Sequence, residues 1–403
     1  MKKRSICISV YALLGFLLSC YGTSSRSVLS QDSVESKLKH AEKQLTLLLA
    51  KSEKADAIPR TTKDGVIHWT NPEFDWTEGF FPGSCWLLYE ATKEDKWKQR
   101  AEHFQSKFEA HKYLTTNHDL GFVFNSSFGN GYKLTGNEQF KEIMITAGNS
   151  LITRFHPKIG AIRSWDIDKG WQSERGWKFP VIIDNMMNLE LLFKLSEFTG
   201  DTKYKDIAIV HANTTLTNHF REDFSSYHVI DYDPDTGNVR LKQTAQGYSN
   251  ESSWARGQAW GLYGYTVCYR YTNDKKYLRH AENIADFIIK NNKISDDGIP
   301  YWDYDAPNIP DEPRDVSAAA IAVSALLELD EYSTKNYSPY IHKTISCLSS
   351  PEYLAEIGKN NLFLLKHAVG SIPHGVEIDV PLNYADYYYL EALMRLNSTL
   401  IKD

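Results

Sequence analysis

Apolar residues recur every three to four positions along most of the chain, the spacing of the buried face of an amphipathic helix. The pattern predicts twelve helices, near residues 33–54, 79–92, 95–112, 119–134, 138–155, 184–198, 202–220, 252–271, 275–292, 315–332, 338–349 and 383–397. Every second helix is the more apolar of its pair, as expected for a helix that packs on all sides. The chain is therefore predicted to be all-α.

A short phrase repeats between successive helices. It begins with Thr92, Thr135, Thr199 or Thr272, continues through a polar turn and places an aromatic residue five positions after the threonine. Gly, Asn or Asp can end the first helix, and Asp, Glu or Thr can cap the next. Such units indicate a helical array. Six hairpins closed into a toroid, an (α/α)6 barrel, fit the alternation in apolarity, and an open superhelical solenoid is the alternative.

In a closed barrel the six inner helices are parallel, so their N-termini gather at one end. The residues there are polar and aromatic: Trp76 and Glu78, His118 and Asp119, Asp184 and Asn185, Ser252 to Trp260, Arg314 to Ser317, and Asn383 to Asp386. Helix capping explains individual serines and aspartates. It does not explain two carboxylates, an arginine and several tryptophans on one rim, so we expect the functional site at this end.

Asp119 and Asp184 precede neighbouring inner helices, and their carboxyl groups are expected to face one another. Asp184 lies between Pro180-Val181-Ile182-Ile183 and Met186-Met187. Burial and repulsion from Asp119 would raise its pKa, whereas the helix dipole would lower it by a smaller amount. If burial dominates, Asp184 is a protonated carboxylic acid near neutral pH, suited to general acid catalysis.

Arg256 and Trp260 are four residues apart and share one helix face. A guanidinium can bind a carboxylate through two parallel hydrogen bonds, and an indole can cover a sugar ring. The pair is therefore a candidate receptor for an anionic sugar. The alternative is a structural ion pair beside a core tryptophan.

The 403 residues, 42% hydrophobic and 24% charged, have an ordinary globular composition. The N-terminus differs, because Lys2-Lys3-Arg4 precedes an apolar run from Ile6 to Leu18 and then Ser19-Cys20. We interpret residues 1–19 as an export signal of the bacterial lipoprotein type with Cys20 lipidated, or alternatively as a plain secretory signal. Residues 20–32 are then a linker and 33–403 a single catalytic domain. The expected location is the periplasm, with a lipid anchor as the only membrane contact.

The net charge of −6 would become −9 without residues 1–19, which hold three basic and no acidic residues. Nucleic acid is therefore an unsuitable partner. Cys85, Cys268 and Cys347 lie in apolar runs and are predicted to be buried thiols. No spacing suggests a metal site. The segment 231–237 is only faintly similar to a calcium loop, and a solvated turn is expected there.

Several of these motifs resemble those of one family. They are Asp75 to Phe80, His118 to Phe122, Ile183 to Asn188, Trp254 to Trp260 and Val380 to Tyr388. Together they are similar to the unsaturated glucuronyl hydrolases, glycoside hydrolase family 88. A sister family that acts on unsaturated rhamnogalacturonan usually has an Arg-Gly-Asn-Gly-Trp type motif, whereas this chain has Arg256-Gly257-Gln258-Ala259-Trp260.

The resemblance implies an (α/α)6 barrel, no cofactor and hydration of a C4=C5 double bond. The substrate would be a 4,5-unsaturated uronic acid at the non-reducing end of a lyase-generated glycosaminoglycan oligosaccharide. Asp184 would donate a proton to C4 and assist water attack at C5, and Asp119 would hold the sugar and tune Asp184. An enol ether is activated by protonation, which suits one acid/base carboxyl.

The resemblance also implies binding residues. Trp76, Arg256 and Trp260 match pocket walls, His228 lies in a matching segment, and Thr244 and Gln246 lie in a loop that contacts the uronate. Many relatives have histidine where this chain has Ala245. Before the last helix, relatives that accept sulfate tend to have hydroxyls and a lysine, but Ser371 to Val376 contains Ser371 and His374 and no lysine. Trp165 is a weaker candidate wall residue, for which packing is an equal alternative.

Two other functions remain as alternatives to this enzyme. An inverting hydrolase of saturated glycans could use the same fold, with separate acid and base carboxyls and a water between them. A lipid-anchored glycan-binding protein would need the aromatic walls alone, and the presence of both Asp119 and Asp184 argues against it.

Overall fold

The computed structural model describes residues 29–291 and 296–402. Its helices are α1 (Gln31–Ala55), α2 (Phe80–Thr92), α3 (Asp95–Ser106), α4 (Leu120–Phe124), α5 (Asn130–Thr135), α6 (Glu138–Ile152), α7 (Leu189–Thr199), α8 (Lys203–Asn218), α9 (Ala255–Thr272), α10 (Lys275–Lys290), α11 (Val316–Tyr332), α12 (Ser338–Leu348) and α13 (Asn383–Lys402). Each predicted helix is present, with its ends shifted by a few residues.

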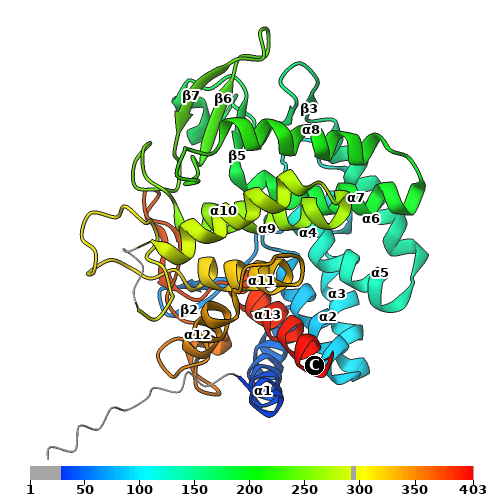
Figure 1. Cartoon of the computed structure of the whole chain (residues 1–403). Helices are drawn as coiled ribbons and strands as arrows, with labels where there is room; N and C mark the ends of the chain where they lie inside the picture. Colours follow the sequence, from blue (N-terminus) through cyan, green and yellow to red (C-terminus); the bar gives the residue numbers. More distant parts are fainter. Residues whose placement is uncertain (1–28, 292–295, 403) are drawn as a thin grey trace, which may run out of the picture.

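Six inner segments form a closed ring (Figure 1). They are α2, the segment from α4 to α5, α7, α9, α11 and α13, and each packs against the next. The last, α13, packs against both α11 and α2, which closes the ring. The outer helices α1, α3, α6, α8, α10 and α12 pack on α13, α2, α4, α7, α9 and α11 respectively. The (α/α)6 barrel is therefore confirmed, and the open solenoid is excluded.

The repeated phrase forms four similar turns. In each, the threonine hydroxyl donates to the carbonyl four residues earlier and accepts the backbone N–H two residues later. The residue after the threonine is left-handed in all four, which ends the helix. The aromatic residues that follow are buried: Trp97, Phe140, Tyr204 and Tyr277. Each turn thus fixes an outer helix against an inner one.

The two inner segments that carry the predicted carboxyls depart from a regular α-helix. The inner segment that follows Asp119 contains a π-helical turn, Asn125–Gly129, between α4 and α5. The inner segment that contains Asp184 begins with a 3-10 turn, Ile183–Asn188, before α7. Such irregularities occur often at functional sites.

Nine short strands were not predicted. They are β1 (Pro59–Lys63), β2 (Val66–Trp69), β3 (Phe155–His156), β4 (Ala161–Ile162), β5 (Pro180–Ile182), β6 (Val229–Tyr232), β7 (Val239–Gln243), β8 (Ala368–Ser371) and β9 (Val376–Val380). They form four small antiparallel sheets, of which β5-β6-β7 is the largest. Three of the strands that lead into inner helices or their loops, β5, β6 and β8, also position site residues.

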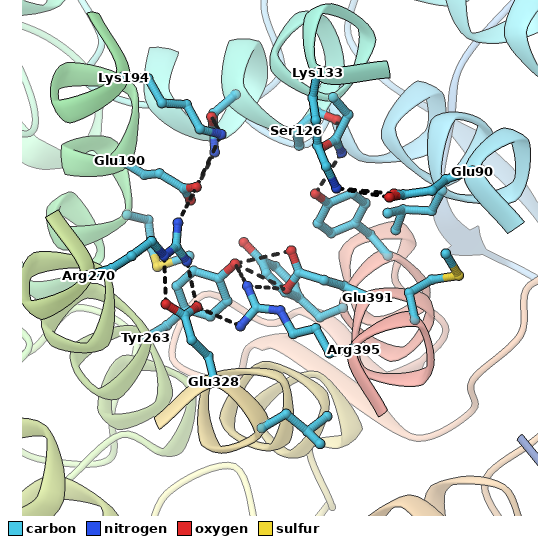
Figure 2. A pocket seen from close by; sticks show the side chains of 18 of the residues that line it. Glu90, Ser126, Lys133, Glu190, Lys194, Tyr263, Arg270, Glu328, Glu391 and Arg395 are labelled. Carbon is cyan, nitrogen blue, oxygen red and sulfur yellow. Dashed lines mark hydrogen bonds and ion pairs between the residues drawn. The ribbon is translucent and has the colours of Figure 1, made fainter. Parts of the chain in front are cut away.

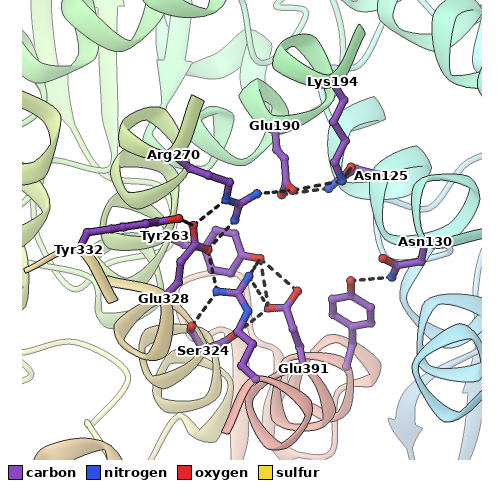
Figure 3. Close-up of polar contacts among 12 residues, drawn as sticks. Asn125, Asn130, Glu190, Lys194, Tyr263, Arg270, Ser324, Glu328, Tyr332 and Glu391 are labelled. Atoms are coloured by element: carbon purple, nitrogen blue, oxygen red, sulfur yellow. Dashed lines mark hydrogen bonds and ion pairs between the residues drawn. The ribbon is translucent and has the colours of Figure 1, made fainter. Parts of the chain in front are cut away.

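A network of charges joins four inner helices at the end of the barrel where those helices finish (Figure 3). Arg270 of α9 binds Glu190 of α7 and Glu328 of α11, and Arg395 of α13 binds Glu328 as well. Tyr263 of α9 donates to Glu391 of α13. These partners are half-buried or buried, so the network holds the ring together at this end.

The structure also describes the three predicted buried thiols and the segment 231–237. Cys85 and Cys268 are buried free thiols, whereas Cys347 is only half-buried. The segment 231–237 is a turn in which the Asp233 side chain accepts the N–H groups of Asp235 and Thr236 and pairs with Lys178. Within the described ranges no group of His, Cys, Asp or Glu is arranged to hold a metal, and no helix is long and apolar enough to cross a membrane. The predicted signal and Cys20 lie outside the described residues.

Candidate active site

Asp184 and His228 are brought together by the pairing of β5 with β6. Ile182 lies opposite Val229, and the N–H of Ile183 donates to the carbonyl of His228 at 3.0 Å. The next residue, Asp184, therefore lies at the start of the inner segment that continues as α7, beside the imidazole. His228 Nε2 lies 3.6 Å from Asp184 Oδ2.

The tautomer of His228 follows from its other ring nitrogen. His228 Nδ1 accepts the backbone N–H groups of Ala245 and Gln246, both at 3.1 Å. Burial and the charge of Arg256 hold the pKa of His228 well below its usual value, so the ring is neutral. The single ring proton is then on Nε2, and it faces Asp184. The contact uses backbone of residue 245, so an alanine there preserves it.

Asp184 has the properties expected of a general acid. Burial raises its pKa to about 7, while the charge of Arg256 and the indole N–H of Trp260 oppose part of the rise. Asp184 Oδ2, His228 Nε2 and Trp260 Nε1 are all buried and have no hydrogen-bond partner among the described residues. Buried polar atoms without partners are rare in folded proteins, so this carboxyl oxygen and the two ring nitrogens near it indicate a site shaped for a ligand.

Asp119 is positioned by the adjacent histidine and by a chain of buried amides. His118 Nε2 lies 3.2 Å from Asp119 Oδ1, and His118 Nδ1 accepts from Asn188 Nδ2 at 3.2 Å. Asn188 Nδ2 also donates to Asn185 Oδ1, and Asn185 donates to the carbonyl of Ile162. Burial lowers the pKa of His118 to about 3, so this ring is neutral too.

The two segments approach closely at Gly121. Its N–H donates to Asn188 Oδ1 at 2.9 Å, and a Cβ at this glycine would lie 2.3 Å from the Asn188 Cα. Only glycine allows this approach. Burial is the larger cause of the raised pKa of Asp119, and the charge of the nearby Asp184 raises it further. The two carboxyls are therefore within electrostatic reach of one another, and the expectation that they face one another stays a prediction.

The two predicted aromatic walls differ. Trp76 is half-buried and packs on Phe80, Phe122 and Tyr384, with 4.8 Å between its ring centre and that of Tyr384. Part of its surface is therefore free to contact a sugar. Trp260 is fully buried against Phe122 and Tyr388, so it offers the polar edge of its indole to Asp184 rather than a ring face.

Arg256 is 1% exposed and its guanidinium is already occupied. One terminal nitrogen binds Asp315 and the carbonyl of Val369, and the other binds the carbonyl of Gly370 at 2.7 Å. The group also lies 4.5 Å above the Trp254 ring. The structure thus favours the alternative in which Arg256 forms a structural ion pair rather than binding a sugar carboxylate. Its charge still lowers the pKa of Asp184.

The other predicted residues line a wall that leads outward from His228. Trp165 contacts the edge of His228 and stacks on Trp177. Gln246 donates from its amide to the carbonyl of Gly370 at 3.2 Å, which joins its loop to β8. Beyond β8 the Ser371 hydroxyl is 2.7 Å from His374 Nδ1. Thr244 stabilises its loop by accepting the N–H of Gly247.

Sequence reasoning missed four residues of this end: Asn185 and Asn188 as a positioning pair, and Trp171 and Arg175 on the outer wall. The two asparagines, three residues apart in an otherwise apolar stretch, are an unusual pattern that could have indicated a buried polar contact. Trp171 and Arg175 lie in an irregular segment, where periodicity gives no signal.

A separate pocket of about 450 Å³ lies at the opposite end of the barrel (Figure 2). Its polar lining includes the network of Glu190, Arg270, Glu328 and Arg395, together with Lys133 and Glu90, which pair with each other. Four acidic residues there, Glu90, Glu190, Glu328 and Glu391, are paired with basic ones. The catalytic chemistry is therefore assigned to the other end, where the polar atoms are unpaired.

Comparisons with known proteins all point to one family. The model of Glycosyl Hydrolase Family 88 matches residues 50–397. An unsaturated glucuronyl hydrolase of Formosa agariphila is 41% identical over 406 residues, with 100% of both chains covered. The crystal structure of an unsaturated glucuronyl hydrolase specific for heparin superposes with a TM-score of 0.87 at 44% identity, covering 93% of this chain and 99% of that one. A mutant of the Streptococcus agalactiae enzyme, complexed with dGlcA-GalNAc6S, gives 0.77 at 30% identity, covering 92% and 93%.

Proposed function

The chain belongs to glycosyl hydrolase family 88, and on this premise we propose how its residues remove a 4,5-unsaturated uronic acid from the non-reducing end of a glycosaminoglycan oligosaccharide. Removal of this sugar is the activity of the chain. The observation that carries the residue assignment is the buried Asp184, with its pKa raised to about 7, whose Oδ2 has no hydrogen-bond partner among the described residues, as is also true of His228 Nε2 and Trp260 Nε1.

The reaction begins with proton transfer from Asp184 to C4 of the unsaturated ring. An enol ether accepts a proton at this carbon because the ring oxygen stabilises the positive charge that develops at C5. Asp184 is then a carboxylate and can take a proton from a water that attacks C5. The hydroxyl added at C5 makes a hemiketal. Its C5–O5 bond breaks, which leaves a 5-keto group and a hemiacetal at C1, and the hemiacetal collapses to an aldehyde with release of the shortened sugar as an alcohol.

The neighbouring groups support each step. The neutral His228 presents its Nε2 proton to the site and can donate to a substrate oxygen. Trp260 Nε1 is placed to stabilise Asp184 once it is ionised, since it already lowers the pKa of that carboxyl. Asp119, held by His118, can accept a hydrogen bond from a sugar hydroxyl. Trp76 offers a partly exposed ring face to the sugar.

An inverting hydrolase of saturated glycans requires one carboxylate that stays ionised as the base. Burial raises the pKa of both Asp119 and Asp184, and the charge of Asp184 raises that of Asp119 further, so the environment disfavours the ionised form that such a base needs. This electrostatic arrangement favours the hydration reaction.

The activity is tested with unsaturated disaccharides prepared by lyase from chondroitin and from heparin. Loss of the ultraviolet absorbance of the conjugated double bond, with release of free hexosamine, is the expected result. The matched control is the corresponding saturated disaccharide, from which no hexosamine should be released. Equal cleavage of the saturated and unsaturated forms would contradict the proposal.

We also propose that the chain is exported and anchored to a membrane by a lipid attached to Cys20. The support is the basic, apolar and Leu-Leu-Ser-Cys pattern of residues 2–20. Labelling cells with a fatty acid tests this, since the wild type should take up label and Cys20→Ala should not. Label on both variants, or on neither, would contradict lipidation at Cys20.

A further inference from the structure

A half-buried arginine in the hairpin that follows α1 joins two sides of the site. Arg60, in β1, donates from Nη1 to both carboxylate oxygens of Asp75, at 2.6 and 2.7 Å. It also donates from Nε and Nη2 to the two carboxylate oxygens of Glu377 in β9, at 2.6 and 3.3 Å. Both carboxylates are largely shielded from solvent. A planar guanidinium that binds two carboxylates fixes the direction of each, so Arg60 links the turn before α2 to β9.

On the α2 side, the arginine holds the turn that carries Trp76. Asp75 Oδ1 accepts the backbone N–H of Thr77 at 3.0 Å and its hydroxyl at 2.9 Å, and Trp76 lies between these two residues. The carbonyl of Thr77 accepts from Asn383 Nδ2 at 3.1 Å. The carboxylate of Asp75 therefore sets the place of the one predicted wall residue that keeps an exposed ring surface.

On the other side, Glu377 presses on β8. Its φ of 55° is in the left-handed region, which is uncommon for a residue with a Cβ and is maintained only where the surroundings hold it. Its side chain lies over Gly370, where a Cβ would be 2.3 Å from Glu377 Oε2. The carbonyl of Gly370 accepts from Arg256 at 2.7 Å and from Gln246 at 3.2 Å. The ion pair with Arg60 thus holds the strand to which both of these residues are bound.

We propose that Arg60 is a positioning residue for the unsaturated sugar. By binding Asp75 and Glu377 together, it sets the spacing between the ring of Trp76 and the wall formed by β8. The proposal rests on the proposed function, in which Trp76 contacts the sugar. Asp184 is placed by a different sheet, β5-β6-β7, so loss of Arg60 should weaken substrate binding more than proton transfer.

The test measures kcat and KM of Arg60→Met on one unsaturated disaccharide. We expect KM to rise about threefold to tenfold, the range for a lost aromatic contact, while kcat per folded molecule changes by less than about twofold. Trp76→Ala and the double variant complete a cycle. Because both changes act on the same ring, the double variant should raise KM little more than Trp76→Ala alone. Arg60→Lys should recover part of the loss, since an ammonium cannot form both planar pairs.

Arg270→Met is the matched control. The Arg270 side chain is 26% exposed, compared with 22% for Arg60, and it also binds two carboxylates, but at the opposite end of the barrel. Its loss should lower the melting temperature and leave KM unchanged. If Arg60→Met is too unstable to assay, Glu377→Gln breaks the same ion pair with a side chain of nearly the same shape, and its KM should rise as well.

An unchanged KM in the folded variant of Arg60 or Glu377 would overturn the proposal. So would an equal rise in Arg270→Met, or KM increases in Arg60→Met and Trp76→Ala that multiply in the double variant, since Arg60 would then act independently of the Trp76 ring. A wild type inactive on every unsaturated substrate would instead contradict the proposed function.

Discussion

Arg256 offers a sharp test because its geometry separates a structural role from direct substrate binding. Arg256→Met keeps the apolar stem and removes the guanidinium. Asp315, which is fully buried, would keep its bonds to Ser317 and lose its cation. The carbonyls of Val369 and Gly370 would lose their donors at the same time.

Removing one partner of a buried ion pair costs about 3–5 kcal/mol, since the other charge stays buried without compensation. For a domain of this size we expect the melting temperature to fall by roughly 4–6 °C. The charge of Arg256 also lowers the pKa of Asp184, so the variant should hold that carboxyl protonated to a higher pH.

The assay combines thermal unfolding with kcat/KM against pH. Asp315→Asn and the double variant complete a cycle, in which the double variant should be less destabilised than the sum of the single changes. Unchanged stability in Arg256→Met, with a large rise in KM and an unshifted pH profile, would refute this reasoning and assign Arg256 to direct substrate binding.

Three other predictions follow from the site and the opposite end of the barrel. With a pKa of about 7, Asp184 is protonated below that pH, so kcat/KM should fall as the pH rises through 7, and Trp260→Phe should move the fall to higher pH; a pH profile that rises there would contradict the acid role. Asn188→Ala should lower kcat about tenfold with little change in KM, because His118 loses the donor that orients it toward Asp119, and a normal kcat would exclude this positioning role. Glu328→Gln should lower the free energy of unfolding by about 2–4 kcal/mol at neutral pH and leave kcat/KM unchanged, since the residue binds two arginines far from the site. The pKa of Glu328 is lowered from 4.5 in the folded state, so the stability it contributes is present above that value and lost as the pH falls, and a wild type equally stable to acid and neutral pH would contradict this.

The barrel could be predicted from the sequence because its information is local. Helical periodicity marks twelve segments, and the four threonine turns repeat the same hydrogen bonds. The strands could not be predicted in the same way. They are two to five residues long, too short to establish an alternating pattern, and β5 pairs with a strand nearly 50 residues later.

The site was predictable as far as residue type and helix position determine it. Asp119 and Asp184 come together because parallel inner helices place their first residues at one end. Arg256 shows where this reasoning stops. Its partners Asp315 and Gly370 are distant in the chain, so only the fold reveals that its guanidinium N–H groups are already hydrogen-bonded within the protein. Trp260 likewise shares a helix face with Arg256, yet its ring is buried by Phe122 and Tyr388.

The central claim is that Asp184 is the acid that protonates the double bond, and Asp386 provides a matched control for it. Both are buried aspartates near the start of an inner segment, Asp184 in the turn before α7 and Asp386 in the first turn of α13, and burial raises the pKa of each to about 7. Asp386 accepts the N–H groups of Leu364 and Leu365, whereas Asp184 Oδ2 has no partner among the described residues. Their roles should therefore differ although their environments are similar.

The direct measurement is kcat for loss of the double-bond absorbance in Asp184→Asn and Asp386→Asn, with melting temperatures for both. Asp184→Asn should lose at least about 10²-fold in kcat, the lower range for general acid catalysis, at an unchanged or higher melting temperature. Asp386→Asn should lose stability and keep most of its kcat per folded molecule. If Asp184→Asn retains more than about a tenth of the wild-type kcat while it remains folded, Asp184 is not the acid.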